Sequence, residues 1–222
     1  MATSSIVLSS AKQEDASDLA ALIQENWHYK TIYPFLYPQC WEDPASVHEH
    51  ILADEQKTLE NTKIEAIKAE IDGKLVVAGR WTLVDPDVEG GGQGDGEPKS
   101  KPPEGSEEFR KATMQAAAKQ FEEKLKGLKH FELINLNVLS GHQRHGLGTK
   151  LTQLCLARAD EKGLPVFLMS VPSARDFYVR FGFEVFDVFE FDLGDWGGKF
   201  RGWGKYRFYG MLRPAQKDTS KH

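Results

Sequence analysis

The stretch Gln143-Arg144-His145-Gly146-Leu147-Gly148 is the part of this sequence that decides the fold. It lies between an apolar run that predicts a strand, residues 131–139, and an amphipathic run that predicts a helix, residues 149–162. The N–H groups at the start of a helix have no partner within the helix, and the helix dipole favours negative charge there. Glycine lets a ligand come close to the backbone. The stretch therefore predicts a site for a phosphate group.

The composition is that of a globular chain with an acidic balance. Its 222 residues include 28 basic and 33 acidic side chains, which gives a net charge of −5. Nucleic-acid-binding proteins generally carry basic surfaces, so we expect no nucleic-acid partner. Cys40 and Cys155 are too few for a disulfide scaffold, and no apolar run approaches the roughly 20 residues of a membrane span. The N-terminus also lacks a signal-peptide pattern. We therefore expect a soluble, cytoplasmic protein with no membrane partner.

The pattern of apolar residues predicts one α/β domain with a mixed sheet. Asp72-Gly73, between two alternating apolar runs, is a strong hairpin signal. An antiparallel meander is followed by strand, helix and strand, and then by a helix and a hairpin. The predicted strands are residues 5–9, 63–70, 75–83, 131–139, 166–171, 183–192 and 206–212, and the predicted helices are 14–27, 43–57, 106–126, 149–162 and 173–181.

Two segments depart from this regular pattern. Residues 85–105 hold six glycines and four prolines among mostly polar residues, which predicts a flexible loop. This loop and the following helix, 85–127, form an insertion within a single domain over residues 1–214, and 215–222 form a polar tail. Residues 27–41 are dense in rings, and their prolines exclude a regular helix, so we expect a structured loop or short turns. The rings either cap the core or line a binding site.

Three phosphate-binding motifs compete for the glycine stretch. A Walker loop requires Lys and then Ser or Thr after its second glycine, but Leu147 and Gly148 stand there. A dinucleotide-binding fingerprint requires a third glycine at the position of Leu151. Neither nucleotide hydrolysis nor dinucleotide binding is therefore expected.

The third motif is carried by Gln143, Gly146 and Gly148. They resemble the Gln/Arg-x-x-Gly-x-Gly/Ala signature of the GNAT superfamily of N-acetyltransferases. The segment from Ala174 to Phe183 resembles the superfamily's Ala-x-x-Phe/Leu-Tyr-x-x-x-Gly-Phe. The resemblance implies a GNAT-like mixed, mostly antiparallel sheet with splayed central strands flanked by helices. It also implies acetyl-CoA as co-substrate, with its pyrophosphate on the glycine stretch and its pantetheine arm in the gap between the splayed strands.

The resemblance extends over most of the chain, from Ile6 to Leu212, although its specific motifs lie between Phe131 and Phe183. It assigns the cofactor site to Val138, Leu139, Gln143, Arg144, His145, Gly146, Leu147, Gly148 and Thr149. Backbone N–H groups near Val138 and Leu139 are candidate donors to the thioester carbonyl. The family often has Asn ahead of the second motif, where this chain has Pro172-Ser173. Ser173 could replace that Asn in the cofactor site or cap the helix, and capping is the favoured interpretation.

Acetyl transfer to an amine requires a neutral amine, a polarised carbonyl and a stabilised leaving thiolate. In the resembling motif the tyrosine at position 178 reaches the CoA sulfur, and a phenol with a pKa near 10 suits a general acid. The alternative for Tyr178 is to pack its ring in the core. Glu132 is the candidate general base, because some GNAT members, including the histone-acetylating group, carry a Glu at this place. Its alternative is an exposed carboxylate at the end of the strand.

Strict alternation along the predicted strand places Glu132 on one face with Ile134, Leu136 and Val138. Asn135 and Asn137 then lie on the opposite face, where they could hold a water molecule that takes the proton. The sequence allows either arrangement for the base.

The resemblance places the acceptor between residues 27–41 and the loop 192–203. Rings and carboxylates in these segments, namely Trp27, Tyr29, Tyr33, Asp195 and Trp196, suit a small amine or polyamine. We expect an N-acetyltransferase that acts on a primary amine by direct attack in a ternary complex, as a monomer or homodimer. Acetylation of protein N-termini or lysines is one alternative, and a non-catalytic acyl-CoA-binding module is another. No metal is expected, because His48 and His50 lack a third ligand nearby.

Overall fold

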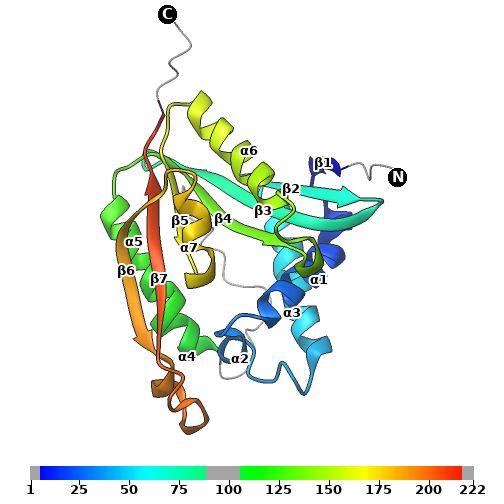
Figure 1. Cartoon of the computed structure of the whole chain (residues 1–222), viewed down its shortest axis with the longest axis vertical. Helices are drawn as coiled ribbons and strands as arrows, with labels where there is room; N and C mark the ends of the chain where they lie inside the picture. The colour runs from blue at the N-terminus through cyan, green and yellow to red at the C-terminus, as the bar shows by residue number, and fades with distance from the viewer. Residues whose placement is uncertain (1–5, 89–105, 217–222) are drawn as a thin grey trace, which may run out of the picture.

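A seven-stranded sheet with the order β1-β2-β3-β4-β5-β7-β6 forms the centre of the computed structural model, which describes residues 6–88 and 106–216 (Figure 1). Neighbouring strands are antiparallel except β4 and β5, which are parallel. This confirms the mixed, mostly antiparallel sheet expected from the sequence. The strands are β1 (Ile6–Ser10), β2 (Ile64–Ile71), β3 (Lys74–Val84), β4 (His130–Val138), β5 (Val166–Ser170), β6 (Glu184–Asp192) and β7 (Lys205–Arg213).

Helices cover both faces of the sheet. On one face, α6 (Leu147–Glu161) and α7 (Arg175–Val179) pack on residues of β4, β5 and β7. On the other face lie α1 (Ala16–His28), α3 (Pro44–Glu60) and α5 (Ala116–Leu125), together with the short helices α2 (Tyr33–Leu36) and α4 (Glu107–Arg110). We call these the α6 face and the α1 face. Among the described residues, none of the helices combines the length and apolar character needed to cross a membrane.

The hairpin predicted at Asp72-Gly73 joins β2 and β3. Both residues have positive φ, 52° and 78°, as a two-residue hairpin turn of the type I′ class requires. Ile71 pairs with Lys74 across the turn.

The predicted helix 106–126 is α4, a π-helical turn (Lys111–Gln115) and α5 in succession. Its rings Phe109 and Phe121 are buried in the core of the α1 face. A Cβ atom at Gly210 of β7 would lie 2.9 Å from the Phe121 ring, so the glycine allows α5 to approach the sheet closely. Residues 89–105 of the predicted flexible loop lie outside the described part of the chain, and so do residues 217–222 of the predicted tail.

Strands β4 and β5 separate soon after they begin. Only Phe131 pairs with Val166 and Glu132 with Phe167, whereas β5 stays paired with β7 along its whole length. Figure 1 shows the two strands diverging, with α7 beside the opening. The splayed central strands expected from the sequence are therefore present, and they open a gap in the middle of the sheet.

A β-bulge in β4 changes which residues share a face. Arg80 pairs with Asn135, but its neighbour Trp81 pairs with Leu133, so Ile134 is the extra residue. Residues that pair directly across two strands have their side chains on the same side of the sheet. One side of β3 carries every second residue, namely Thr82, Arg80 and Ala78.

The expectation that Glu132 shares a face with Leu136 and Val138 is therefore wrong. The partners of Glu132, Asn135 and Asn137 are Thr82, Arg80 and Ala78, so all three side chains belong to the α1 face. Leu136 and Val138 pack on the α6 side with Leu147 and Leu151. The bulge supplies the physical reason, because one extra residue inverts the alternation of the strand beyond it.

Candidate functional site

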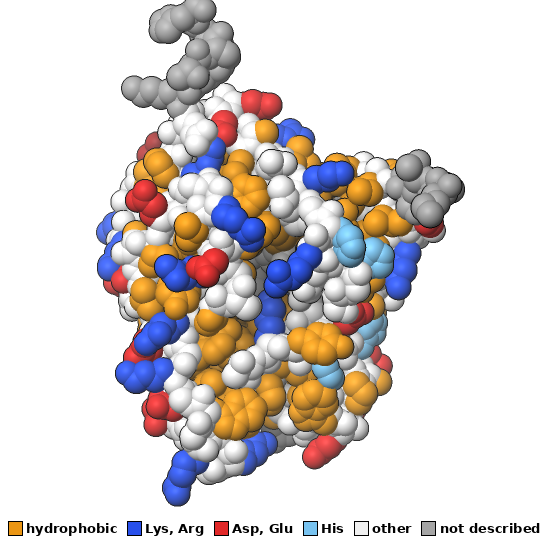
Figure 2. All heavy atoms as spheres, in the orientation of Figure 1, with side chains coloured by type: hydrophobic (Ala, Val, Ile, Leu, Met, Phe, Trp, Pro, Cys, Tyr) orange, Lys and Arg blue, Asp and Glu red, His pale blue; other side chains and the backbone are white. Residues whose placement is uncertain are grey.

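A cavity of about 520 Å³ lies at the gap between β4 and β5. Leu136 and Val138 of β4 line it, and Phe177 and Tyr178 of α7 line it from the α6 face. Its other walls are the glycine stretch, Asn26 near the end of α1, Lys30 just after it, and the residues Val171, Ser173, Ala174 and Arg180. Basic side chains border the hollow on the face shown in Figure 2.

The glycine stretch forms an anion-binding end of this cavity. Arg144 and Gly146 have positive φ, 63° and 79°, and Gly146 is the N-cap of α6. No side chain caps this helix, so the N–H groups of its first turn are not taken by a cap. The site therefore has the backbone donors and the helix dipole that a phosphate requires, with the guanidinium of Arg144 beside them.

Gln143 connects this end to β4. Its side-chain Nε2 donates a hydrogen bond to the carbonyl of Val138 at 3.2 Å. The N–H of Leu139 donates to the carbonyl of Val76 at 2.8 Å, so it cannot serve the thioester as expected from the sequence. Because peptide groups alternate between the two edges of a strand, the N–H of Val138 points to the gap. Of the two backbone N–H groups expected as donors to the thioester carbonyl, only that of Val138 therefore points to the gap.

The structure brings most of the predicted cofactor residues together around this cavity, although three of them do not contribute to its lining. The glycine at 148 leaves a narrow space, since a Cβ atom there would lie 3.5 Å from Val138 and 3.6 Å from Phe177. Leu147 is buried in the core, and neither Leu139 nor His145 lines the cavity. The predicted residues that do line it are Val138, Gln143, Arg144, Gly146, Gly148, Thr149 and Ser173.

Ser173 does not cap α7. The N-cap of that helix is Ala174, and it receives no side-chain cap. Ser173 lies instead in a 3₁₀ turn (Pro172–Ala174) that borders the cavity. The favoured capping interpretation is wrong because the 3₁₀ turn places the serine one residue before the N-cap.

Tyr178 both packs in the core and borders the cavity. Its ring contacts Phe177 and Phe183 at centroid distances of 5.1 and 5.7 Å, and the side chain is 8% exposed. Burial raises the pKa of its hydroxyl above the ordinary value. The phenol therefore keeps its proton near neutral pH, and Tyr178 lines the cavity, where its O–H is available to donate a hydrogen bond.

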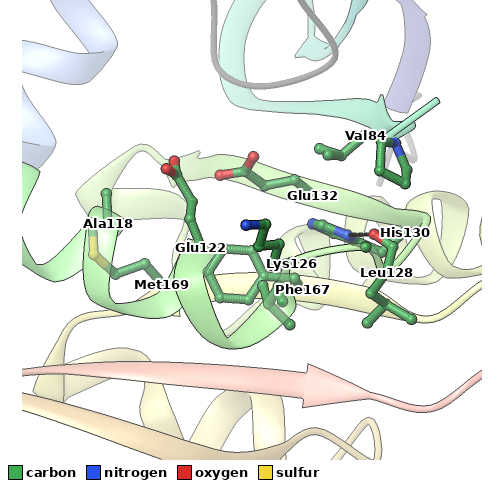
Figure 3. Close-up of a pocket in the computed structure, with 12 residues that line it drawn as sticks. Val84, Ala118, Glu122, Lys126, Leu128, His130, Glu132, Phe167 and Met169 are labelled. Carbon is green, nitrogen blue, oxygen red and sulfur yellow. Dashed lines mark hydrogen bonds between the residues drawn. The ribbon is translucent and has the colours of Figure 1, made fainter. Parts of the chain in front are cut away.

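A second cavity of about 260 Å³ lies on the α1 face, between α5 and the starts of β4 and β5 (Figure 3). Glu132 lines it and is 8% exposed, so it is not the exposed strand-end carboxylate that the alternative foresaw. Phe167 and Met169 of β5 form an apolar wall. Glu122 of α5 also lines the cavity, and in Figure 3 its carboxylate lies on the same side as that of Glu132.

His130 is a residue of this cavity that the sequence did not single out. Its Nδ1 lies 2.8 Å from the carbonyl of Leu128, which can only accept, so Nδ1 carries the proton and donates it. Burial lowers the pKa of the imidazole, with the hydrogen bond to Leu128 as a smaller, opposing effect. A neutral ring with a free lone pair on Nε2 results. Its signal in the sequence was its place two residues before Glu132, on the same face of the strand.

The predicted substrate residues do not converge on one site. Tyr33 is buried in the core, Tyr29 is 74% exposed, and Asp195 is exposed. Trp196 packs on Phe109 of the inserted helix, with centroids 5.0 Å apart. Trp27 does not line the first cavity but contacts a residue that does, because Lys30 Nζ lies 4.4 Å from the centroid of the Trp27 ring.

The two ring-rich segments nevertheless meet. Phe35 from the first stacks on Phe109 at 5.0 Å and contacts Phe200 from the second at 4.0 Å. Trp203 contacts both Phe35 and Phe200. The two segments thus contact each other directly, and Phe109 of the inserted helix α4 packs on both, which makes one aromatic cluster on the α1 face.

Comparisons with known proteins agree with this geometry. The family model described as Acetyltransferase (GNAT) family matches residues 22–183. A comparison with curated proteins finds no match.

Similar solved structures cover nearly the whole chain. One is described as histone acetyltransferase HPA2 and related acetyltransferase from Corynebacterium glutamicum; it is 18% identical, with 98% of this chain and 99% of that chain covered and a TM-score of 0.61. The PaiA N-acetyltransferase from Thermoplasma acidophilum, in complex with coenzyme A, is 15% identical over 95% and 99%, with a TM-score of 0.53. The ribosomal-protein-S18-alanine N-acetyltransferase from Escherichia coli is 12% identical over 98% and 99%, with a TM-score of 0.54. At these identities the likeness shows the fold.

Proposed function

This chain belongs to the acetyltransferase (GNAT) family, and from that premise we propose that it transfers the acetyl group of acetyl-CoA to the nitrogen of a small primary amine or polyamine. Enzymes of this family use acetyl-CoA as co-substrate. One observation carries the proposal. A cavity with an anion-binding helix start runs through the gap between β4 and β5, and a second cavity with a buried carboxylate adjoins the same two strands on the α1 face.

The residues of the first cavity fit the donor. The first turn of α6 and Arg144 would hold the pyrophosphate, and the N–H of Val138 would bind along the pantetheine arm. Gly148 keeps the passage between α6 and α7 open. When bound, acetyl-CoA supplies an acetyl group activated as a thioester, with a thiol as leaving group.

Tyr178 would stabilise the leaving sulfur by a hydrogen bond. Its raised pKa lies well above that of a thiol, near 8.5, so complete proton transfer from the phenol to a thiolate is unfavourable. This differs from the acid role expected from an ordinary tyrosine. A donor that keeps its proton still lowers the barrier, because it is aimed in advance at the position where negative charge develops.

Glu132 would take the proton that the attacking amine gives up. An alkylammonium has a pKa near 10.4, so an amine reaches the site mostly charged and must lose a proton before it can attack. Glu132 is the buried carboxylate on the α1 face of β4, and the neutral His130 stands beside it in the same cavity. Either directly or through a water molecule, this pair can receive that proton.

The size and charge of the second cavity favour a slim amine. Its volume of about 260 Å³ admits an alkylamine chain, and its walls are mostly apolar. Two carboxylates, Glu122 and Glu132, face one basic side chain, Lys126, in this lining, and the acidic excess attracts an ammonium group before it is deprotonated. A linear diamine or polyamine matches this combination of apolar wall and acidic groups.

The test is release of free thiol from acetyl-CoA across a panel of monoamines, polyamines, lysine peptides and peptides with free N-termini. We expect turnover with alkylamines or polyamines. The variant Tyr178→Phe should lose about 10²-fold in kcat with little change in KM for the amine, since one hydrogen-bond donor to developing charge is removed. Tyr209→Phe is the matched control, because Tyr209 is a half-buried tyrosine of β7 that lines neither cavity.

Two results would contradict the proposal. Turnover restricted to peptides would replace the small amine by a protein substrate. Binding of acetyl-CoA without thiol release from any amine or peptide would replace catalysis by binding alone.

A further inference from the structure

Lys30 places a primary amine inside the donor cavity. It follows α1, whose end is held against β4 by a hydrogen bond from Asn26 Nδ2 to Asn137 Oδ1 at 2.8 Å. Asn26 and Lys30 both line the cavity that also contains Gly146 and Tyr178. The amine of Lys30 is thus a wall of the same space that the donor would occupy.

Lys30 and Tyr178 reach this space from opposite sides of the sheet. Asn137, which binds α1, belongs to the α1 face, whereas Tyr178 packs with the residues of the α6 face. In acyl transfer the nucleophile attacks the carbonyl carbon from one direction, and the leaving sulfur departs in another. The attacking amine and the hydrogen-bond donor to the sulfur therefore need separate positions around the thioester. An amine from the α1 face and a phenol from the α6 face meet this requirement.

The surroundings of Lys30 favour a reactive amine. Burial lowers its pKa to about 8, so a substantial fraction of the side chain is neutral in mildly alkaline solution. The ring of Trp27 lies 4.4 Å from Nζ and opposes this effect in part, because it stabilises the cation. The other charged or titratable side chains that line the cavity are Arg144, Arg180 and Tyr178, and none of the described residues that line it is a carboxylate.

We propose that Lys30 is an internal acetyl acceptor, modified by the acetyl-CoA bound in its own cavity. The Nζ lone pair forms a bond to the carbonyl carbon of the thioester, and the carbon–sulfur bond breaks. The sulfur leaves with the bonding electron pair, and the proton lost by nitrogen ends on sulfur, directly or through water. The products are Nε-acetyl-lysine at position 30 and the free thiol of CoA, with no other reactant.

The modification would regulate the donor site. Acetylation removes a positive charge from the cavity and lengthens a side chain in its wall. Both changes oppose binding of a second anionic donor, so the reaction stops after one acetyl group per chain. An amine acceptor that arrives first would compete with Lys30 for the same acetyl group. The proposal rests on the donor half of the proposed function but requires no external acceptor.

The experiment is incubation of the full chain with acetyl-CoA alone, followed by intact mass and peptide mapping. We expect one acetyl group per chain, at Lys30, forming about tenfold or more faster than at Lys150, because a positioned amine has a high effective concentration. Lys150 is the matched control, an exposed lysine just beyond the glycine stretch. The rate at Lys30 should rise with pH and level off above about 8, whereas that of an ordinary lysine keeps rising toward 10.4.

The variant Lys30→Arg separates a nucleophile from a cation, because arginine keeps the charge and cannot be acetylated in this way. It should lose the single modification. If Lys30 acquires acetyl groups no faster than Lys150, or if Lys30→Arg still takes up one acetyl group at the same rate, the proposal is overturned. Thiol release with the amine panel is measured separately, so failure of self-acetylation and failure of the proposed function give different results.

Discussion

The α6 face and the α1 face of the central gap were built in different ways. The proposed donor half comes mostly from one stretch of chain, β4 through α7, in which each element follows the last by a short connection, and Asn26 and Lys30 complete its lining from the end of α1. The proposed acceptor half on the α1 face combines the start of β4, Phe167 and Met169 of β5, and the inserted helix α5. Binding of the donor therefore depends mostly on local backbone geometry, whereas the acceptor side depends on packing between distant segments.

The largest effect should come from the base of the acceptor half. Glu132→Gln keeps the shape of the side chain but removes its ability to take a proton, so kcat should fall by about 10²- to 10⁴-fold. The dissociation constant for acetyl-CoA should change little, because Glu132 does not line the donor cavity. Steady-state kinetics with the best amine and calorimetry with CoA provide the two measurements.

Glu122→Gln is the matched control for that prediction. Glu122 lines the same cavity from the exposed surface of α5, so its loss should raise KM for a cationic amine and leave kcat nearly unchanged. Equal losses of kcat in the two variants would mean that neither carboxylate has a special role and that the two halves are less distinct than the structure indicates.

An intermediate effect is expected at the passage of the donor half. Gly148→Val places branched methyl groups between Val138 and Phe177, where a Cβ atom alone already makes van der Waals contact at 3.5 and 3.6 Å. The added methyl groups narrow the passage that the donor would occupy, so the binding of acetyl-CoA should weaken by about tenfold or more, a loss of about 1.4 kcal/mol or more in binding free energy. Gly148→Ala, which adds only the Cβ, should bind nearly as well as the wild type.

The readout for this pair is the dissociation constant for CoA, measured together with KM for the amine. The amine KM should stay close to the wild-type value in both variants. A rise in the amine KM as large as the loss of CoA affinity would show that the two halves are coupled through the gap.

The smallest effect is expected where the inserted helix α5 packs on Gly210 of β7. In Gly210→Ala the new methyl group would lie 2.9 Å from Phe121 and 3.0 Å from Phe186, so α5 must shift or the rings must turn. We expect a loss of about 1 kcal/mol in the free energy of unfolding, at the lower end for overpacked cores. Urea unfolding measures it, and the amine KM should rise more than the KM for acetyl-CoA.

Phe121→Leu in the Gly210→Ala background is the compensating variant. A smaller side chain on α5 should relieve the contact and recover part of the lost stability, which a double-mutant cycle would register as coupling. Additive losses would mean that Gly210 does not govern the position of α5.

Most of the fold followed from patterns in the sequence. The Asp72-Gly73 turn, the alternating strands and the amphipathic runs were each visible locally, and predicted boundaries agree with the structure within a few residues. The face of Glu132 was predicted wrongly because a bulge at Ile134 leaves no mark in an alternating apolar run. Lys30 and His130 were overlooked because neither belongs to a motif, and each matters only through the cavity it lines.

The anion-binding end of the donor half follows from the sequence alone, because a strand, a glycine turn and a helix start are consecutive and local geometry directs their hydrogen-bond donors to one place. The proposed acceptor half depends instead on tertiary packing. There the bulge sets the side on which Glu132 lies, and the packing of α5 on β7 closes a cavity around it. The tertiary structure also brings Lys30, which follows α1, into the donor cavity. These positions depend on contacts between residues far apart in the chain, and local patterns do not encode such contacts.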